Sequence, residues 1–270
     1  MSEYEERQIV ESLGYYDMFF DGIKGIIDKV SETQAEKLEA VAEKCADAIA
    51  AERWVHTFGA GHSAIPGMET FPRIGSFVGF HQLNELNLSF NAQVVGGMAQ
   101  RQSSFLERVE GYAGIILANH RFSPQDVAIL FSNSGINELI VDMALLLKEK
   151  GVTVVGLTSI AHSMSNQPRH SSGKRLSEVV DISIDTCCPE GDALVDVPGL
   201  DYRVGGSSTI VSCIIMNGIV SQTAAALQQR GYTPTIWPSH NVHTSPEEYA
   251  LMEAQEEKVY EQYWERLARS

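Results

Sequence analysis

Four short runs of apolar and β-branched residues most strongly constrain how this 270-residue chain can fold. They cover residues 54–58, 127–131, 152–157 and 179–184, and a weaker run lies at 77–80. Runs that are apolar throughout are typical of parallel strands in a sheet that is covered on both faces. Helical patterns separate them, at residues 105–119, 138–150 and 209–229. Because strands alternate with helices, the sequence predicts a doubly wound α/β fold.

The two ends of the chain carry helical patterns of their own. Apolar residues recur at helical spacing over 14–30 and 34–52, and a helix-start signal, Ser31-Glu32-Thr33-Gln34, lies between them. We therefore expect a pair of N-terminal helices. A charged helical pattern from Ser245 to Ser270 has proline at its first helical position. The predicted organisation is one domain, with helices over 1–53, a doubly wound core over 54–230 and a C-terminal extension over 231–270.

The charge balance limits the partners. Twenty Lys and Arg against 35 Asp and Glu give a net charge of −15. Nucleic acids and anionic membranes bind surfaces with clustered Lys and Arg, so the sequence predicts neither partner. An anionic small molecule stays compatible, because the field inside a pocket can oppose the net charge. The acidic start Met1-Ser2-Glu3 does not resemble a secretory signal. Polar residues interrupt the apolar stretch 210–227, which predicts a buried core helix. The four cysteines fit neither a redox motif nor a zinc-finger spacing, so we expect reduced thiols in a cytoplasmic protein.

Three of the predicted strands end in loops that carry hydroxyl groups or glycine. These loops are Gly59-Ala60-Gly61-His62-Ser63, Ser132-Asn133-Ser134-Gly135-Ile136-Asn137 and Thr158-Ser159. Ligands of open parallel sheets bind beyond the carboxyl ends of the strands, so we expect these loops to form one site. Glycine allows close backbone approach, and hydroxyls, backbone N–H groups and a helix start suit a tetrahedral anion such as phosphate. Asn137 also fits an ordinary helix N-cap, which is compatible with anion binding.

Taken together, these loops resemble those of the sugar isomerase (SIS) family. The similarity covers about residues 35–230 and is closest to small stand-alone bacterial SIS proteins described as phosphoheptose isomerases. The matching features are the Gly59–Ser63 loop, Glu69, Arg73, the stretch from Arg169 to Lys174 and the segment from Gly191 to Leu194. The resemblance implies a three-layer sandwich with a central, mostly parallel five-stranded sheet. It also implies a phosphosugar ligand, and a homodimer or homotetramer with sites near subunit interfaces.

By this resemblance, Ser132, Ser134 and Asn137 hold the phosphate, with help from Ser63. The other expected substrate-binding residues are Gly61, Arg73, Asn133, Ser159 and Lys174. Two features depart from the established phosphoheptose isomerases. Pro66 and Pro72 interrupt the helix expected after the first loop. Glu69 and Arg73 stand where those enzymes have His and Glu, so their catalytic pair cannot be carried over.

Isomerisation through an enediol needs a base that moves a proton between adjacent carbons and an acid for the oxygens. Glu69 follows Ser63 by six residues and is the preferred base, although a salt bridge to Arg73 one turn on explains it equally well. His81 and His62 are candidates for opening a sugar ring.

A polar loop and a set of metal-compatible side chains add further candidates. His170 lies in a polar loop, and packing does not explain why the loop is so polar. Lys174 could neutralise a second anionic group. The expected reaction needs no cofactor. A divalent metal is an alternative, and its candidate ligands are His62, Glu69, His81 and Asp192.

The sequence thus predicts a sugar-phosphate isomerase of the aldose–ketose type that acts by enediol proton transfer. Three alternatives stay open. The first is a sugar-phosphate-binding regulatory protein, although the first 50 residues contain no basic helix-turn-helix pattern. The second is a SIS-fold lyase or deaminase of an amino-sugar phosphate. The third is an isomerase of a sugar with another anion, such as a sulfonate, because hydroxyl and amide donors discriminate weakly among tetrahedral anions.

Overall fold

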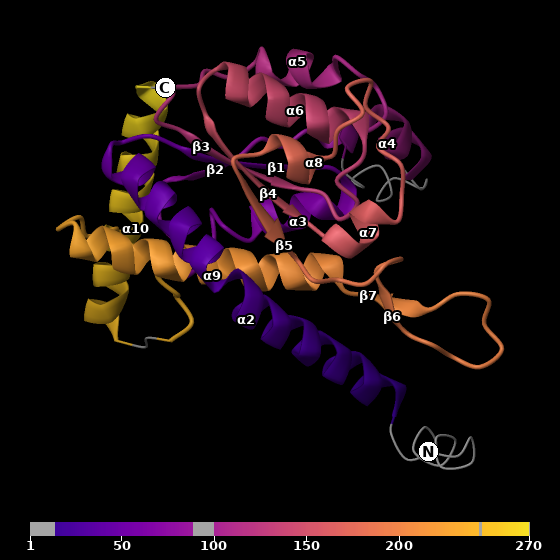
Figure 1. Ribbon diagram of the computed structural model, residues 1–270. Helices are drawn as coiled ribbons and strands as arrows, with labels where there is room; N and C mark the ends of the chain where they lie inside the picture. The colour runs from indigo at the N-terminus through magenta and orange to yellow at the C-terminus, as the bar shows by residue number, and fades with distance from the viewer. Residues whose placement is uncertain (1–13, 89–99, 243–244, 270) are drawn as a thin grey trace.

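A five-stranded parallel sheet forms the centre of the protein (Figure 1). The computed structural model describes residues 14–88, 100–242 and 245–269. In this part of the chain the strand order is β2-β1-β3-β4-β5, and all neighbouring strands are parallel. The strands are β1 (Val55–Gly59), β2 (Phe80–Gln82), β3 (Val127–Phe131), β4 (Thr153–Thr158) and β5 (Ile182–Asp185). The predicted doubly wound α/β fold is confirmed.

Helices cover both faces of the sheet, which makes it the middle layer of three. One face packs against α2 (Tyr15–Ala50) and α9 (Ser208–Gln229), and the other against α5 (Tyr112–Leu117), α6 (Glu138–Glu149) and α8 (Leu176–Val179). Each face has its own cluster of buried apolar side chains, and successive residues of β1, β3 and β4 contribute to the two clusters in turn. This alternation explains why the strands are apolar throughout their length.

The remaining elements are short or lie near the end of the chain. They are the 3₁₀ helices η1 (Gly61–Ala64) and η2 (Leu86–Leu88), the helices α3 (Ile65–Met68), α4 (Gln100–Leu106), α7 (Ile160–Met164) and α10 (Pro246–Ala268), and the strands β6 (Ala193–Val195) and β7 (Val204–Gly206).

One long helix opens the described chain, so the predicted pair of N-terminal helices is wrong. α2 runs without a break over 36 residues. The hydroxyl of Thr33, inside the expected helix-start signal, donates a hydrogen bond to the carbonyl oxygen of Lys29 at 2.7 Å. A threonine that bonds four residues back stays within its helix and does not cap a new one. Val30 and Gln34 are buried here, so packing carries the helix through this segment.

Two other segments also differ from their prediction. The helical pattern at 105–119 is divided between α4 and α5, because Gly111 between them has a φ of +83°. The polar segment 185–208 contains a small antiparallel hairpin formed by β6 and β7. The weak run at 77–80 contributes only the first residue of β2.

The helix α9 packs along α2. Arg230 at its end forms ion pairs with Glu43 and Asp47 of α2, at 2.5 and 2.9 Å. α9 also has the length and apolar composition of a membrane-crossing helix, and 50% of that apolar stretch is buried inside the protein. The core helix of a globular protein has the same properties.

The outer edge of β5 is covered by side chains of α2. The backbone N–H of Asp185 donates to Gln34 Oε1 at 3.1 Å, and the ammonium of Lys37 donates to the carbonyl oxygen of Ser183 at 2.8 Å. Two backbone groups of this edge strand therefore have partners. At the opposite edge, β2 has only three residues.

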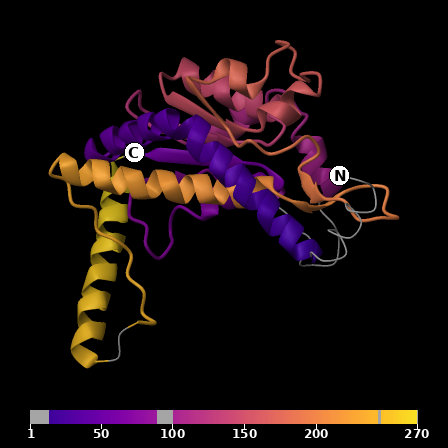
Figure 2. The ribbon, with the colours of Figure 1, turned by 60° about the horizontal axis from the view of Figure 1, so that its bottom comes forward.

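The C-terminal helix α10, predicted from the sequence, stands out from the body of the protein (Figure 2). Near its C-terminal end, the buried Arg266 guanidinium donates to the carbonyl oxygens of Arg53 and Ile49, at 2.8 and 3.2 Å. Val259 packs into the same apolar cluster as α2 and α9. One half of the helix is thus anchored to the core.

Candidate functional site

The loops after β1, β3 and β4 meet at one edge of the sheet. In the sheet register, Gly59 of β1 lies beside Phe131 of β3, and Phe131 lies beside Leu157 of β4. The three strands therefore end level with one another, at the edge where parallel sheets bind ligands. Two small hollows, of about 30 and about 10 Å³, open here, and their walls share Ser63, Phe131 and Ser132.

The two hollows differ in the chemistry of their walls. The first contains Glu107 and Asn137, and we call it the acidic hollow. The second, the hydroxyl hollow, is lined by Asn133 and by four hydroxyl residues that the sequence analysis missed, Thr186, Ser208, Thr209 and Ser212. Among the described residues that line the hydroxyl hollow, none carries a charge. A hydroxyl cluster at the start of the helical pattern 209–229 is the signal that could have indicated three of them.

The first loop, Gly59 to Ser63, is closely packed. A side chain at Gly59 would drive its Cβ into the carbonyl oxygen of Ser63, so only glycine fits this turn. Gly61 has a φ of +58°, in the left-handed region that glycine adopts without strain. The loop leads into η1 and the four-residue α3, so the predicted interruption of a long helix near Pro66 is confirmed. His62, a candidate acid, is exposed and lines neither hollow.

The second loop, Ser132 to Asn137, forms a tight turn between β3 and α6. Gly135 has a φ of +60°, and a Cβ there would lie 2.7 Å from Thr158 Oγ1. Its N–H donates to Ser132 Oγ at 3.1 Å. Asn133 Oδ1 is buried, and it has no hydrogen-bond partner among the described residues. Ser134 is half-buried beside it.

Asn137 begins α6, but its side chain makes no capping hydrogen bond. Its Nδ2 donates to Glu107 Oε2 at 2.8 Å, and its Oδ1 accepts from Arg169 Nη1 at 2.5 Å. Ser103 Oγ donates to the other oxygen of Glu107 at 3.3 Å. Burial raises the pKa of Glu107, although the bonds from Asn137 and Ser103 oppose this shift. The site thus holds a half-buried, oriented carboxylate, and the sequence gives no signal that distinguishes it from an ordinary helical Glu.

Glu69 and Arg73, by contrast, form an ion pair with each other. Arg73 Nε donates to Glu69 Oε1 at 3.1 Å, and the side chains of Arg73 and Glu69 are 48% and 33% exposed, respectively. Glu69 also faces α9, where burial and then the charge of Glu69 raise the pKa of Cys213. Neither residue lines the two hollows. The salt bridge considered in the sequence analysis is therefore what the structure contains.

His81 lies on β2, away from the two hollows. Its Nδ1 is 3.2 Å from Nδ1 of His56, and its ring also contacts His120. Burial, followed by the charges of His56 and His120, lowers the pKa of His81 to about 4. The imidazole is therefore neutral at physiological pH. It lines a separate, aromatic cavity.

His170 holds its loop in place. The N–H of Ser172 donates to His170 Nδ1 at 3.1 Å, so Nε2 carries the proton and donates to Asp142 Oδ1 at 2.8 Å. The imidazole is 8% exposed and connects the loop to α6. The same loop places the guanidinium of Arg169 against the side chain of Asn137. Lys174 of this loop is exposed.

Ser159 is fully buried and caps α7. Its Oγ accepts from the N–H of His162 at 3.1 Å and donates to the carbonyl oxygen of Cys188 at 2.6 Å. Both bonds are internal to the protein, so the hydroxyl supports the neighbouring loop. It lines neither hollow.

The candidate metal ligands lie apart. Asp192 Oδ1 accepts the N–H groups of Ser207 and Ser208, at 3.0 and 2.7 Å, and so occupies the start of α9. Glu69 is paired with Arg73, and His81 lies among histidines on β2. Within residues 14–88, 100–242 and 245–269, no group of three or more His, Cys, Asp or Glu side chains is arranged to hold a metal ion.

Comparisons with known proteins identify the family. The model of the SIS domain family matches residues 18–159. A UPF0309 protein of Shouchella clausii is 33% identical over 230 residues, which cover 85% of this chain and 92% of the relative. A UPF0309 protein of Listeria monocytogenes serotype 4b is 30% identical over 242 residues, or 90% and 93% of the two chains.

A solved structure has a similar fold. The phosphoheptose isomerase of Neisseria gonorrhoeae superposes with a TM-score of 0.52 at 12% identity, over 82% of this chain and 99% of that one. At this identity the likeness concerns the fold alone. From the domain match and these relatives, the chain belongs to the SIS domain family and is a member of its UPF0309 proteins.

Proposed function

We propose that this protein is a phosphosugar isomerase that interconverts an aldose and a ketose through an enediol. One observation carries the proposal: the half-buried carboxylate of Glu107 lies beside Ser63 and Ser132, at the sheet edge where open parallel sheets bind ligands. The solved structure with a similar fold is named as a phosphoheptose isomerase. A half-buried base that adjoins an anion-compatible hollow is an arrangement that suits this reaction.

The hydroxyl hollow suits the anionic end of the substrate. Its walls offer the hydroxyls of Ser63, Ser132 and Thr186 as donors, and the described lining has no carboxylate to repel an anion. Asn133 Oδ1, which has no partner among the described residues, faces the same space and can accept from a substrate hydroxyl. Because Ser63 and Ser132 line both hollows, a ligand that starts in the hydroxyl hollow extends toward Glu107.

Glu107 replaces Glu69 as the proposed base. It removes the proton from the carbon beside the carbonyl, and the electron pair moves onto the carbonyl oxygen to give the enediolate. The protonated carboxyl then returns this proton to the former carbonyl carbon, while the hydroxyl proton of the neighbouring carbon passes to the first oxygen, so that the carbonyl moves to the neighbouring carbon. The bond from Asn137 fixes the carboxylate, and burial raises its pKa, which brings the base closer to neutral pH and strengthens it.

The test is proton exchange in deuterated water with a panel of phosphosugars, followed by NMR. We expect deuterium at the carbon beside the carbonyl, and Glu107→Gln should slow this exchange by at least about 100-fold. The amide can still accept from Asn137, so binding, measured by ligand-induced thermal shift, should persist. Glu69→Gln is the matched control and should leave exchange largely unchanged.

Each departure has a defined meaning. If Glu69→Gln abolishes exchange and Glu107→Gln does not, Glu69 is the base. If wild type binds phosphosugars tightly but exchanges no proton across the panel, the protein is a binding regulator and not an isomerase. Release of ammonia or of an ether-linked acid would indicate a lyase or deaminase, and selective binding of sulfonated sugars would change the substrate class.

We also infer a homodimer or homotetramer, as the family resemblance implies. Exposed aromatic side chains gather at the start of α2, where Tyr15, Tyr16 and Phe20 are 45%, 67% and 54% exposed. Apolar patches of this kind are typical of association surfaces. Light scattering on the purified protein measures the state directly, and a monomer at micromolar concentration would contradict the inference.

A further inference from the structure

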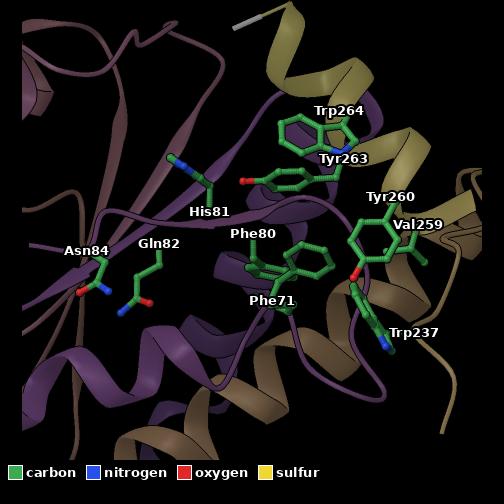
Figure 3. A pocket seen from close by; sticks show the side chains of 11 residues that line it. Phe71, Phe80, His81, Gln82, Asn84, Trp237, Val259, Tyr260, Tyr263 and Trp264 are labelled. Atoms are coloured by element: carbon green, nitrogen blue, oxygen red, sulfur yellow. The ribbon is translucent and has the colours of Figure 1, made fainter. Parts of the chain in front are cut away.

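An aromatic cavity lies apart from the proposed phosphosugar site. It has a volume of about 360 Å³ and opens between the edge strand β2, the residues Phe71 and Pro72, and the helix α10 (Figure 3). This volume falls in the range of small-molecule sites, about 300–1,000 Å³. The proposed isomerase reaction uses none of its lining residues.

The aromatic walls of the cavity are held in place by their own contacts. Phe71 stacks on Tyr263 with ring centroids 5.7 Å apart, and it meets Trp237 edge-on at 5.8 Å. Trp237 in turn packs edge-on against Tyr260 at 5.4 Å. Three separate segments of the chain therefore present rings to one space (Figure 3). Such a wall is formed before any ligand arrives, which lowers the entropic cost of binding.

The polar part of the lining is uncharged. It includes His81, Gln82 and Asn84 on and after β2, besides the hydroxyl and indole N–H groups of the aromatic residues. His81 is neutral at physiological pH, because its pKa is lowered to about 4, chiefly by burial. One of the two N–H groups of Gln82 Nε2 donates to the carbonyl oxygen of Ala64 at 2.9 Å. Among the described residues that line the cavity, none carries a formal charge.

These properties select the ligand's chemistry. A phosphate or carboxylate is disfavoured, because the described lining has no cation to pair with it and the chain has a net charge of −15. A flat ring, by contrast, gains stacking area on the aromatic walls, and amide and imidazole groups can pair with polar atoms on its edge. We propose that this cavity binds an uncharged heteroaromatic ring with hydrogen-bonding groups on its edge, the chemistry of a nucleobase or nucleoside.

The experiment is isothermal titration calorimetry of the full chain with adenosine as the probe. Adenosine should bind with a dissociation constant of about 1 mM or tighter. Trp264→Ala should weaken this binding about tenfold, because the base loses one of the rings on which it stacks. Trp264 is 61% exposed, so its truncation leaves the core intact. Leu251→Ala is the matched control, since Leu251 is 72% exposed on the same helix and does not line the cavity.

Two comparison ligands define the chemistry. Adenosine 5′-monophosphate should bind more weakly than adenosine, and methyl glucoside, an uncharged ring without an aromatic face, should not bind. Tighter binding of the phosphate ester, or binding of the glucoside in place of adenosine, would overturn the proposal. A complete lack of adenosine binding would also overturn the proposal. If, in that case, Trp264→Ala also dissociates an oligomer, the cavity belongs to a contact between copies of the chain. None of these outcomes depends on isomerase activity.

Discussion

Replacing Asp126 with asparagine should destabilise the protein strongly, because this carboxylate is fully buried among donors. Arg53 donates to its two oxygens at 3.0 and 3.1 Å, and the N–H groups of Trp54 and Ser123 donate at 3.1 and 2.6 Å. Burial alone would raise the pKa of Asp126. The contacts with His56 and Arg53 and the two backbone N–H bonds outweigh burial and hold this pKa well below its usual range.

The expected magnitude follows from these partners. The substituted amide would keep one acceptor oxygen but would turn an NH₂ group toward N–H donors, and the guanidinium of Arg53 would lose its counter-charge. Removing one partner of a buried ion pair costs about 3–5 kcal/mol. The Arg53 side chain is 17% exposed and regains some hydration, so we expect about 3 kcal/mol. A domain with a typical stability of about 5–15 kcal/mol remains folded after this loss.

The assay is urea unfolding at pH 7, read as a shift of the midpoint at an unchanged m-value. Asp21→Asn is the control. Asp21 is 65% exposed and pairs with Lys24 on the helix surface, so the urea midpoint of this variant should equal that of the wild type. A loss below about 1 kcal/mol in Asp126→Asn would refute the reasoning, because it would mean that water replaces the lost bonds.

The pH dependence gives a second test of Asp126. Its pKa is lower in the folded protein than its ordinary value of 3.8, so its contribution is fully present well above pH 4 and is lost as the pH falls further. The stability difference between wild type and Asp126→Asn should therefore shrink as the pH is lowered from about 5. A difference that stays constant down to about pH 3 would show that the charge of Asp126 is not its source.

Three further substitutions test other parts of the structure. Gly59→Ala would drive a Cβ into the Ser63 carbonyl oxygen, so it should abolish the thermal shift by phosphosugars and also lower the melting temperature. Gly25→Ala, in the middle of α2 with nothing within 4 Å of the new Cβ, should raise the free energy of unfolding by about 0.5–1 kcal/mol in urea unfolding. Arg266→Met removes two bonds from a buried guanidinium to backbone carbonyls and should make α10 the first site of limited proteolysis; equal protease resistance would show that other contacts hold the helix.

The sequence predicted the sheet well because the three central strands, β1, β3 and β4, are buried on both faces. The run at 127–131 had to be apolar throughout, since Ile129 faces one apolar cluster and Leu130 the other. The opening helix was mispredicted for a local reason. Ser, Glu, Thr and Gln in succession form a helix-start signal, yet only the three-dimensional packing shows that Gln34 lies against β5 and that Thr33 bonds backward.

The candidate site was only partly predictable. The loops around Ser63 and Ser132 were identified because glycine and hydroxyl residues directly follow apolar strands. This pattern involves only neighbouring residues, so it is visible in the sequence. Glu107 was missed because its position in the site depends on a contact with Asn137, 30 residues later in the chain. Glu69 was favoured because it is near Ser63 in sequence, but its side chain reaches Arg73 and not the hollows. Sequence distance does not indicate which way a side chain points after a turn.

The covered edge of β5 has a consequence for how copies of this protein can associate. An open edge strand is a template on which a strand from another chain can add, and this is a common start of aggregation. Gln34 and Lys37 already occupy two of the backbone groups that such a strand would need, and three-residue β2 offers too short a template at the other edge. We therefore expect that the chain resists growth of its sheet into fibrils, and that any assembly forms between helices.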